Sequence, residues 1–287
     1  MDSTLRLADG RQLGYVEYDQ ADGRPVFYFH GFPGSRLEAR LLHDSAEKAG
    51  IRIIAPDRPG CGLSTYQPRR TLLDWPADVA ALADSLKITT FSVVGISGGG
   101  PYALACAAKL PGRLASVILI SSLGPLDKPG AAQGMGFLDA AFLSLADRLP
   151  WLARGMLSLV SRIDLEWMLK QTLADLCQRD QAALADLQVW QVLLDETREA
   201  FRQGAGGIVQ DAAIYKRSWG FRLGEITLPV MLWQGEADHE VPHAMGRALA
   251  LALPRCEAHF IPEEGHISLA YYHIDEILGR IRYIAAR

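Results

Sequence analysis

Short apolar stretches alternate along this chain with longer segments in which apolar residues recur at helical spacing. After an opening hairpin at 5–7 and 13–18, apolar strand patterns fall at 26–29, 51–55, 91–96 and 115–121. Helical patterns at 36–49 and 71–87 separate them. Nearly continuous apolar strands are typical of a parallel sheet covered on both faces. The order therefore predicts an α/β protein with right-handed crossovers.

This alternation stops after the strand at 115–121. Between 123 and 223 the pattern is helical only, with segments at 137–149, 154–161, 165–178 and 181–200. A buried-strand pattern returns at 228–234, and a helix at 268–285 closes the chain. The middle could be a separate all-helical domain, but the return of the α/β pattern favours an insertion. We therefore predict a core in two parts, 1–122 and 224–287, with a helical cap at 123–223.

Composition narrows the class of protein. The 287 residues are 49% hydrophobic and 22% charged, with a net charge of −4, as expected of a globular protein without a nucleic-acid partner. We expect no membrane span, because no apolar run reaches ~20 residues, and no signal peptide. The four cysteines are scattered without metal or disulfide spacing, so neither a metal site nor a disulfide framework is predicted, and a cytoplasmic location is expected.

The candidate chemistry begins where the strand at 91–96 runs into Ser97. Gly95 and Gly99 stand two residues either side of it, and a helix pattern follows. This is the pattern of a nucleophile elbow, in which a tight strand-to-helix turn exposes the serine hydroxyl. A dinucleotide-binding loop is the competing interpretation. Serine in place of the second glycine, and the lack of an acidic residue at 111–120, count against it.

Three further segments, together with this elbow, resemble the α/β-hydrolase superfamily over nearly the whole chain outside the cap. The segment 30–34, His-Gly-Phe-Pro-Gly, resembles its HG-x-P loop, although many folds contain such a glycine-rich turn. The resemblance implies that the backbone N–H groups of Phe32 and Gly98 form the oxyanion hole. His30 itself is expected to fix the loop by hydrogen bonds. The segment 57–64 also resembles the family and is expected to be structural.

The other two segments supply an acid and a base. The segment 234–242 resembles the family's G-x-x-D-x-x-V-P pattern, which gives Asp238 the acid position and leaves Glu236 and Glu240 as solvated loop charges. His239 adjoins the acid in sequence and is expected to be a loop residue. The segment 263–268 resembles the family's G-H turn and makes His266 the base. With Ser97, these residues follow the Ser, Asp, His chain order of the family's triads.

The resemblance implies a mostly parallel eight-stranded sheet with flanking helices and a helical cap. It also implies a serine hydrolase that forms an acyl-enzyme without a metal or organic cofactor, and we expect activity to fall below about pH 6 as the base becomes charged. Serine at the elbow excludes the relatives that attack epoxides or carbon–halogen bonds with aspartate. We expect a carboxylesterase for small to medium apolar acyl substrates, acting as a monomer or homodimer.

Two other enzyme classes and one non-enzyme class stay open: a prolyl iminopeptidase-like aminopeptidase, a carbon–carbon bond hydrolase, and a ligand receptor that keeps the fold. An iminopeptidase would need cap carboxylates to hold the substrate amine, but helical spacing predicts that the available ones are solvated. They are Asp164, Glu166, Asp195, Glu196 and Glu199. The cap contains eight large apolar residues of note, and we expect most of them to pack its own helices together and a minority to line the substrate pocket. The eight are Phe137, Phe142, Trp151, Trp167, Met168, Trp190, Phe201 and Trp219.

Overall fold

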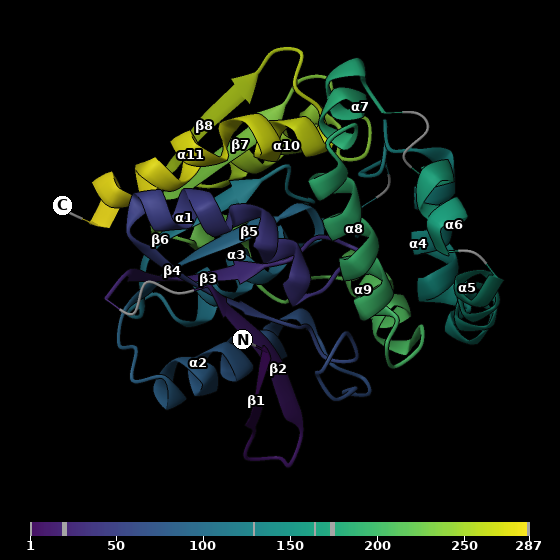
Figure 1. Ribbon diagram of the computed structural model, residues 1–287, viewed down its shortest axis with the longest axis horizontal. Coiled ribbons are helices and arrows are strands. Elements are labelled where there is room, and N and C mark those ends of the chain that lie inside the picture. The colour runs from purple at the N-terminus through teal and green to yellow at the C-terminus, as the bar shows by residue number, and fades with distance from the viewer. Residues whose placement is uncertain (1, 19–21, 129, 164, 173–175, 286–287) are drawn as a thin grey trace.

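A computed structural model describes residues 2–18, 22–128, 130–163, 165–172 and 176–285. Eight strands form one twisted sheet in the order β1-β2-β4-β3-β5-β6-β7-β8 (Figure 1). The strands are β1 (Asp2–Arg6), β2 (Gln12–Tyr18), β3 (Arg24–Phe29), β4 (Ile51–Pro56), β5 (Phe91–Ile96), β6 (Leu114–Ile120), β7 (Val230–Gly235) and β8 (Cys256–Ile261). Strands β3 to β8 run parallel, and β2 pairs antiparallel with both β1 and β4. The predicted mostly parallel eight-stranded sheet is confirmed.

Helices cover both faces of this sheet, which explains its continuous apolar strands. On one face lie α1 (His43–Ala49) and α11 (His266–Ala285); on the other lie α2 (Trp75–Ser85), α3 (Gly100–Lys109) and α10 (His243–Ala252). Neighbouring residues of β5 point to opposite layers, since Val93 packs with α2 and α3 while Val94 packs with α1 and α11. Both side chains are fully buried, so each face of the central strand contributes to a hydrophobic core.

Local signals set several helix ends as the sequence predicts. Thr71 and Asp74 form a capping box ahead of α2. The pattern at 36–49 becomes a 3₁₀ segment, η1 (Arg36–Leu42), followed directly by α1. Gly50 ends α1 with φ 64°, a left-handed conformation that glycine adopts without a steric penalty.

Between β6 and β7 the described residues contain helices and no strand; we call helices α4–α9 the helical insertion. They are α4 (Phe137–Arg148), α5 (Pro150–Ile163), α6 (Leu165–Thr172), α7 (Gln178–Leu184), α8 (Leu187–Ala200) and α9 (Gly206–Lys216). The helical insertion lies on the right of the sheet in Figure 1. Whether the boundaries 1–122, 123–223 and 224–287 separate domains stays a prediction.

Three helix expectations inside the insertion are wrong. The segment at 165–178 is not one helix, because α6 ends at Thr172 and Cys177 is the extended residue before α7. The segment at 181–200 is divided near Asp186, whose carboxylate accepts a hydrogen bond from the Gln188 amide at 2.8 Å and starts α8. Helix α9 is missing from the sequence prediction because its glycines resemble a helix break. An added Cβ on Gly207 would lie 2.5 Å from the carbonyl oxygen of Gly60, so close packing, not helix propensity, selects glycine there.

Buried ion pairs tie the insertion to the core. Asp211 of α9 accepts hydrogen bonds from Arg58 at 2.6 Å and Tyr102 at 2.6 Å, and also pairs with Arg70. All four side chains are buried, so each charge has a partner where water does not reach. The segment 57–64 therefore has the structural role that the sequence predicts.

No helix in the described ranges is long and apolar enough to cross a membrane. Among the same residues, no three His, Cys, Asp or Glu side chains come together in a way that could hold a metal ion.

Candidate active site

Ser97 occupies the sharp turn between β5 and α3. Its φ is 49°, a left-handed conformation that costs energy in a residue with a Cβ and that occurs where the surrounding structure imposes it. The flanking glycines permit the turn: an added Cβ on Gly95 would lie 2.6 Å from the Gly99 carbonyl oxygen, and one on Gly99 would collide with the Phe29 carbonyl. The serine thus lies on the strained strand-to-helix turn that the sequence predicts.

Two backbone segments meet beside this serine. Phe32 follows β3 and contacts Gly98, since an added Cβ on Gly98 would lie 2.6 Å from the Phe32 Cβ. Gly98 belongs to a short 3₁₀ turn (Ser97–Gly99), and the first N–H groups of such a turn have no partner inside it. Tyr215 of α9 donates a hydrogen bond to the Gly98 carbonyl at 2.9 Å, which fixes the peptide from the insertion side.

His30 is a buried loop residue. One ring nitrogen, Nδ1, lies 3.0 Å from the Gly31 carbonyl oxygen, and the Arg58 amide donates to Nε2 at 3.3 Å. Burial and the neighbouring Arg58 guanidinium hold the pKa of His30 well below its usual range. Neutral His30 therefore fixes the loop that carries Phe32, as the sequence predicts.

Asp238 and His266 form a buried pair. The Asp238 carboxylate lies 2.9 Å from His266 Nδ1 and accepts a second hydrogen bond on the same oxygen from Gln234 at 3.0 Å. Its other oxygen accepts from the amides of Glu240 at 3.0 Å and Val241 at 2.8 Å. These contacts orient the carboxylate toward the ring. His239, by contrast, is exposed.

A second carboxylate stands beside the other ring nitrogen of His266. Glu240 Oε2 lies 3.5 Å from Nε2, so the expectation that Glu240 is a solvated loop charge is wrong. Glu236 does lie at the surface, where it pairs with Arg247 at 2.7 Å. Burial would lower the pKa of His266, but Asp238 and Glu240 outweigh it and raise the pKa to about 10. Burial raises the pKa of Glu240 to about 7.

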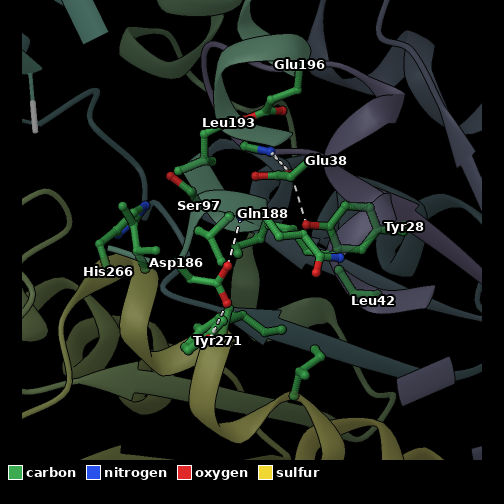
Figure 2. Close-up of a pocket in the computed structure, with 18 of the residues that line it drawn as sticks. Tyr28, Glu38, Leu42, Ser97, Asp186, Gln188, Leu193, Glu196, His266 and Tyr271 are labelled. Carbon is green, nitrogen blue, oxygen red and sulfur yellow. Dashed lines mark hydrogen bonds between the residues drawn. The ribbon is translucent and has the colours of Figure 1, made fainter. Parts of the chain in front are cut away.

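Two cavities of about 450 Å³ and about 240 Å³ adjoin Ser97. Both are lined by Phe32, Pro33, Ser97 and Glu240, and His266 lines the larger one (Figure 2). The smaller cavity is mainly apolar, although Asp139 and Glu240 also line it, and its walls come largely from the helical insertion. These walls include Leu138, Phe142, Leu143, Leu157, Phe201 and Ile208.

Only some of the large apolar side chains in the insertion reach this site. Phe142 and Phe201 line the smaller cavity and Trp219 is buried, whereas Phe137, Trp151 and Trp167 are exposed. The side chain of Met168 lies outside the described residues.

The larger cavity contains two buried carboxyl groups that sequence reasoning did not assign. Glu38 of η1 accepts hydrogen bonds from the Tyr28 hydroxyl at 2.9 Å and the Gly31 amide at 2.7 Å, and Glu196 of α8 accepts from the Ser35 amide at 3.3 Å. Burial raises the pKa of both, and the charge of Glu38 raises that of Glu196 further.

The expectation that Glu196 is solvated is therefore wrong. A signal was available, because Glu196 falls on the same helical face as the buried Val189 and Val192 of α8. Asp195 and Glu166 are half-exposed, and Glu199 pairs with Arg36 at 2.7 Å. Asp164 lies outside the described residues.

Comparison with known proteins adds independent findings. A family model described as the alpha/beta hydrolase fold matches residues 24–271. The chain is 35% identical over 127 residues to a non-heme chloroperoxidase of Streptomyces lividans, covering 43% of this chain and 45% of that protein. It is 30% identical over 259 residues to the dihydrolipoyllysine-residue acetyltransferase component of the acetoin cleaving system of Pseudomonas putida, covering 90% of this chain and 62% of that protein. The chain thus spans only part of these two relatives.

Among solved structures, a thermophilic esterase from Thermogutta terrifontis aligns with a TM-score of 0.73 and 21% identity over 99% of both chains. At this identity the likeness shows a shared fold.

Proposed function

The chain belongs to the alpha/beta hydrolase fold family, and we propose that it is a serine hydrolase that cleaves carboxylic esters through an acyl-enzyme. The observation that carries the proposal is the placement of Ser97. It sits on a strained turn, at a cavity that His266 also lines, and His266 is backed by Asp238 at 2.9 Å.

In this mechanism Ser97 Oγ attacks the carbonyl carbon of the ester while His266 Nε2 takes the hydroxyl proton. Asp238 accepts the Nδ1–H of the ring, fixes its tautomer and stabilises the imidazolium. The carbonyl oxygen gains the negative charge and is held by the N–H groups of Phe32 and Gly98, a contribution of about 3 kcal/mol per donor in known enzymes.

The tetrahedral intermediate then collapses. The alcohol leaves with the proton from His266, and the acyl group stays on Ser97. Water attacks this ester, again losing a proton to His266, and the acid is released as the Ser97 hydroxyl is restored.

The two cavities support a division of the substrate between them. The apolar walls of the smaller cavity fit an acyl chain of small to medium length, and its volume of about 240 Å³ limits that length. Since both cavities are lined partly by helices α4–α9, we propose that residues 123–223 act as a cap that determines substrate choice.

The test is turnover of short 4-nitrophenyl esters by Ser97→Ala, with Ser116→Ala as the matched control. Ser116 is a fully buried serine that pairs with Ser92 at 2.8 Å and lines neither cavity. Ser97→Ala should abolish turnover and fluorophosphonate labelling while unfolding at the wild-type temperature, and Ser116→Ala should retain both. A folded Ser97→Ala variant with most of its activity would exclude the proposal, and a burst without turnover in the wild type would favour a receptor.

One observation favours a second candidate, an aminopeptidase. An added Cβ on Gly31 would lie 3.1 Å from Glu38 Oε1 and 3.7 Å from the Ser97 Cβ, so the Glu38 carboxyl and the nucleophile both lie beside Gly31, and all three residues line the larger cavity. A substrate ammonium group there would meet Glu38 and Glu196. The test is hydrolysis of aminoacyl 4-nitroanilides. If Glu196→Gln abolishes this hydrolysis and the neighbouring Asp195→Asn does not, the aminopeptidase activity is established. Equal rates on substrates with and without the amine would exclude it.

A further inference from the structure

Asp180 of the helical insertion binds the first turn of α11, the helix that starts at His266. Its Oδ2 accepts a hydrogen bond from the His266 amide at 2.9 Å, and its Oδ1 accepts from the amides of Ile267 at 2.9 Å and Ser268 at 2.7 Å. The Asp180 side chain is fully buried. One carboxylate thus accepts from three consecutive amides of a helix 86 residues further along the chain.

These three amides need a partner from outside the helix. The first N–H groups of any α-helix have no acceptor within it, and an Asp, Ser, Asn or Thr just before the helix usually supplies one. Here Gly265 holds that place and has no side chain. An added Cβ on Gly265 would collide with the Asp180 carboxylate, so the glycine leaves room for it. The negative charge also complements the positive end of the helix dipole.

The position of Asp180 separates its effect from substrate binding. It lines neither of the two cavities next to Ser97, whereas His266 lines the larger one. Asp180 can therefore act on the reaction in two ways: through the backbone of residues 266–268, which sets the direction of the imidazole, and through its charge, which helps to raise the pKa of His266. The charge changes only the fraction of His266 that is neutral, so the rate of the neutral form reports the effect of the backbone. Displacements of about 1 Å in a reacting group can cost about a hundredfold in rate.

We propose that Asp180 is a positioning residue for the reaction: it fixes the backbone of His266 from the helical insertion, so that the insertion holds the base toward Ser97. This inference rests on the proposed serine hydrolase function. It means that the insertion contributes to the chemical step as well as to substrate choice. Loss of Asp180 should lower kcat while KM stays close to the wild-type value.

The experiment compares Asp180→Ala and Asp180→Asn with Glu199→Gln. The control changes another contact between insertion and core, the 2.7 Å pair of Glu199 with Arg36, which involves none of residues 266–268. We expect kcat for a 4-nitrophenyl ester, extrapolated from the pH profile to fully neutral His266, to fall about 10- to 100-fold in Asp180→Ala, with KM within twofold. Asp180→Asn, which keeps one acceptor oxygen, should show a smaller fall in kcat. The control should keep both kcat and KM at the wild-type values. Rates are expressed per folded molecule.

The second readout is the low-field proton resonance of the His266 Nδ1–H bonded to Asp238, recorded for each variant at a pH where the ring is charged. It should broaden or shift in both Asp180 variants and stay unchanged in Glu199→Gln. If Asp180→Ala does not fold, Asp180→Asn decides the matter. Variants that match the control in kcat and in this resonance would overturn the proposal. A wild type without turnover would reject the hydrolase instead, and the resonance would still test Asp180.

Discussion

Replacing Glu240 by glutamine should make the protein more active near neutral pH. Glu240 Oε2 lies 3.5 Å from His266 Nε2, the nitrogen that must be unprotonated to accept the Ser97 proton. At that separation two unit charges attract by about 1 kcal/mol in bulk water and by about 5 kcal/mol at an effective dielectric constant of about 20. The contact therefore raises the pKa of His266, and because about 1.4 kcal/mol corresponds to a tenfold change in an equilibrium, removing the charge should increase the neutral fraction of His266 about tenfold or more.

The direction in which the acid limb of the pH profile moves follows from the negative charge that the substitution removes. Three carboxylates, Asp238, Glu240 and Asp180, favour the imidazolium and raise the pKa of His266 to about 10 against the effect of burial. Asp139 of α4 and Glu38 of η1 also face this histidine. These charges move the expected loss of activity well above the pH of about 6 that an ordinary histidine would give. Glutamine at 240 removes one of them, so the acid limb of kcat/KM should move to lower pH by about one unit or more.

The assay is hydrolysis of a 4-nitrophenyl ester between pH 5 and 10, followed at a wavelength where both forms of nitrophenol absorb equally. Near pH 8 the Glu240→Gln variant should be about tenfold faster than the wild type, since about ten times more of its His266 is neutral. Glu236→Gln is the matched control, because Glu236 lies on the same loop but pairs with Arg247 at the surface. Identical acid limbs in Glu240→Gln and Glu236→Gln would refute the reasoning.

Three other changes test separate parts of the structure. Asp238→Asn should lower kcat by several orders of magnitude, because asparagine favours the wrong tautomer of His266, whereas the exposed His239→Ala should change it less than twofold; comparable losses would contradict the assignment of the acid. Phe142→Ala should shift the preferred ester toward longer acyl chains by enlarging the smaller cavity, and an unchanged preference across a chain-length series would argue against that cavity as the acyl site. Asp211→Asn should lower the free energy of unfolding in urea by about 3–5 kcal/mol, since it leaves two buried arginines without their anion. The arginines outweigh burial and lower the pKa of Asp211 to about 2, so its contribution should be complete above about pH 4 and disappear toward pH 2; a loss of stability that begins near neutral pH would have another cause.

The sequence predicts the features that depend on neighbouring residues. Continuous apolar runs give the parallel strands, and glycines flanking Ser97 give the strained turn, because each property is encoded within a few positions. The contact of Asp238 with His266 joins distant segments, yet the resemblance to a family implies it. Where the local signal and the packing disagree, as at Gly207 in α9, the prediction is wrong because tertiary contact overrides helix propensity.

Other site features depend on contacts between distant elements, and the sequence does not reveal them. Glu240 resembles a solvated charge on a loop until the fold brings it to His266. Glu38 and Glu196 lie 158 residues apart and become a pair only when α8 packs against η1. The one local sign of a buried carboxyl group is a charged side chain on an otherwise apolar helix face, as at Glu196.

The helical insertion is bound to the core at the very loops that carry the candidate chemistry. Tyr215 holds the carbonyl of Gly98, Glu196 holds the amide of Ser35 after the Phe32 loop, and Asp180 holds the amide of His266. All three side chains of the insertion are buried, so opening it as a rigid lid would expose or break all three contacts together. Substrate exchange through the larger cavity, which extends from Ser97 to Lys48 and Asp275 between α1 and α11, breaks none of them. We therefore expect the insertion to be a fixed wall of the site, in line with the proposals that it shapes the substrate pocket and positions His266.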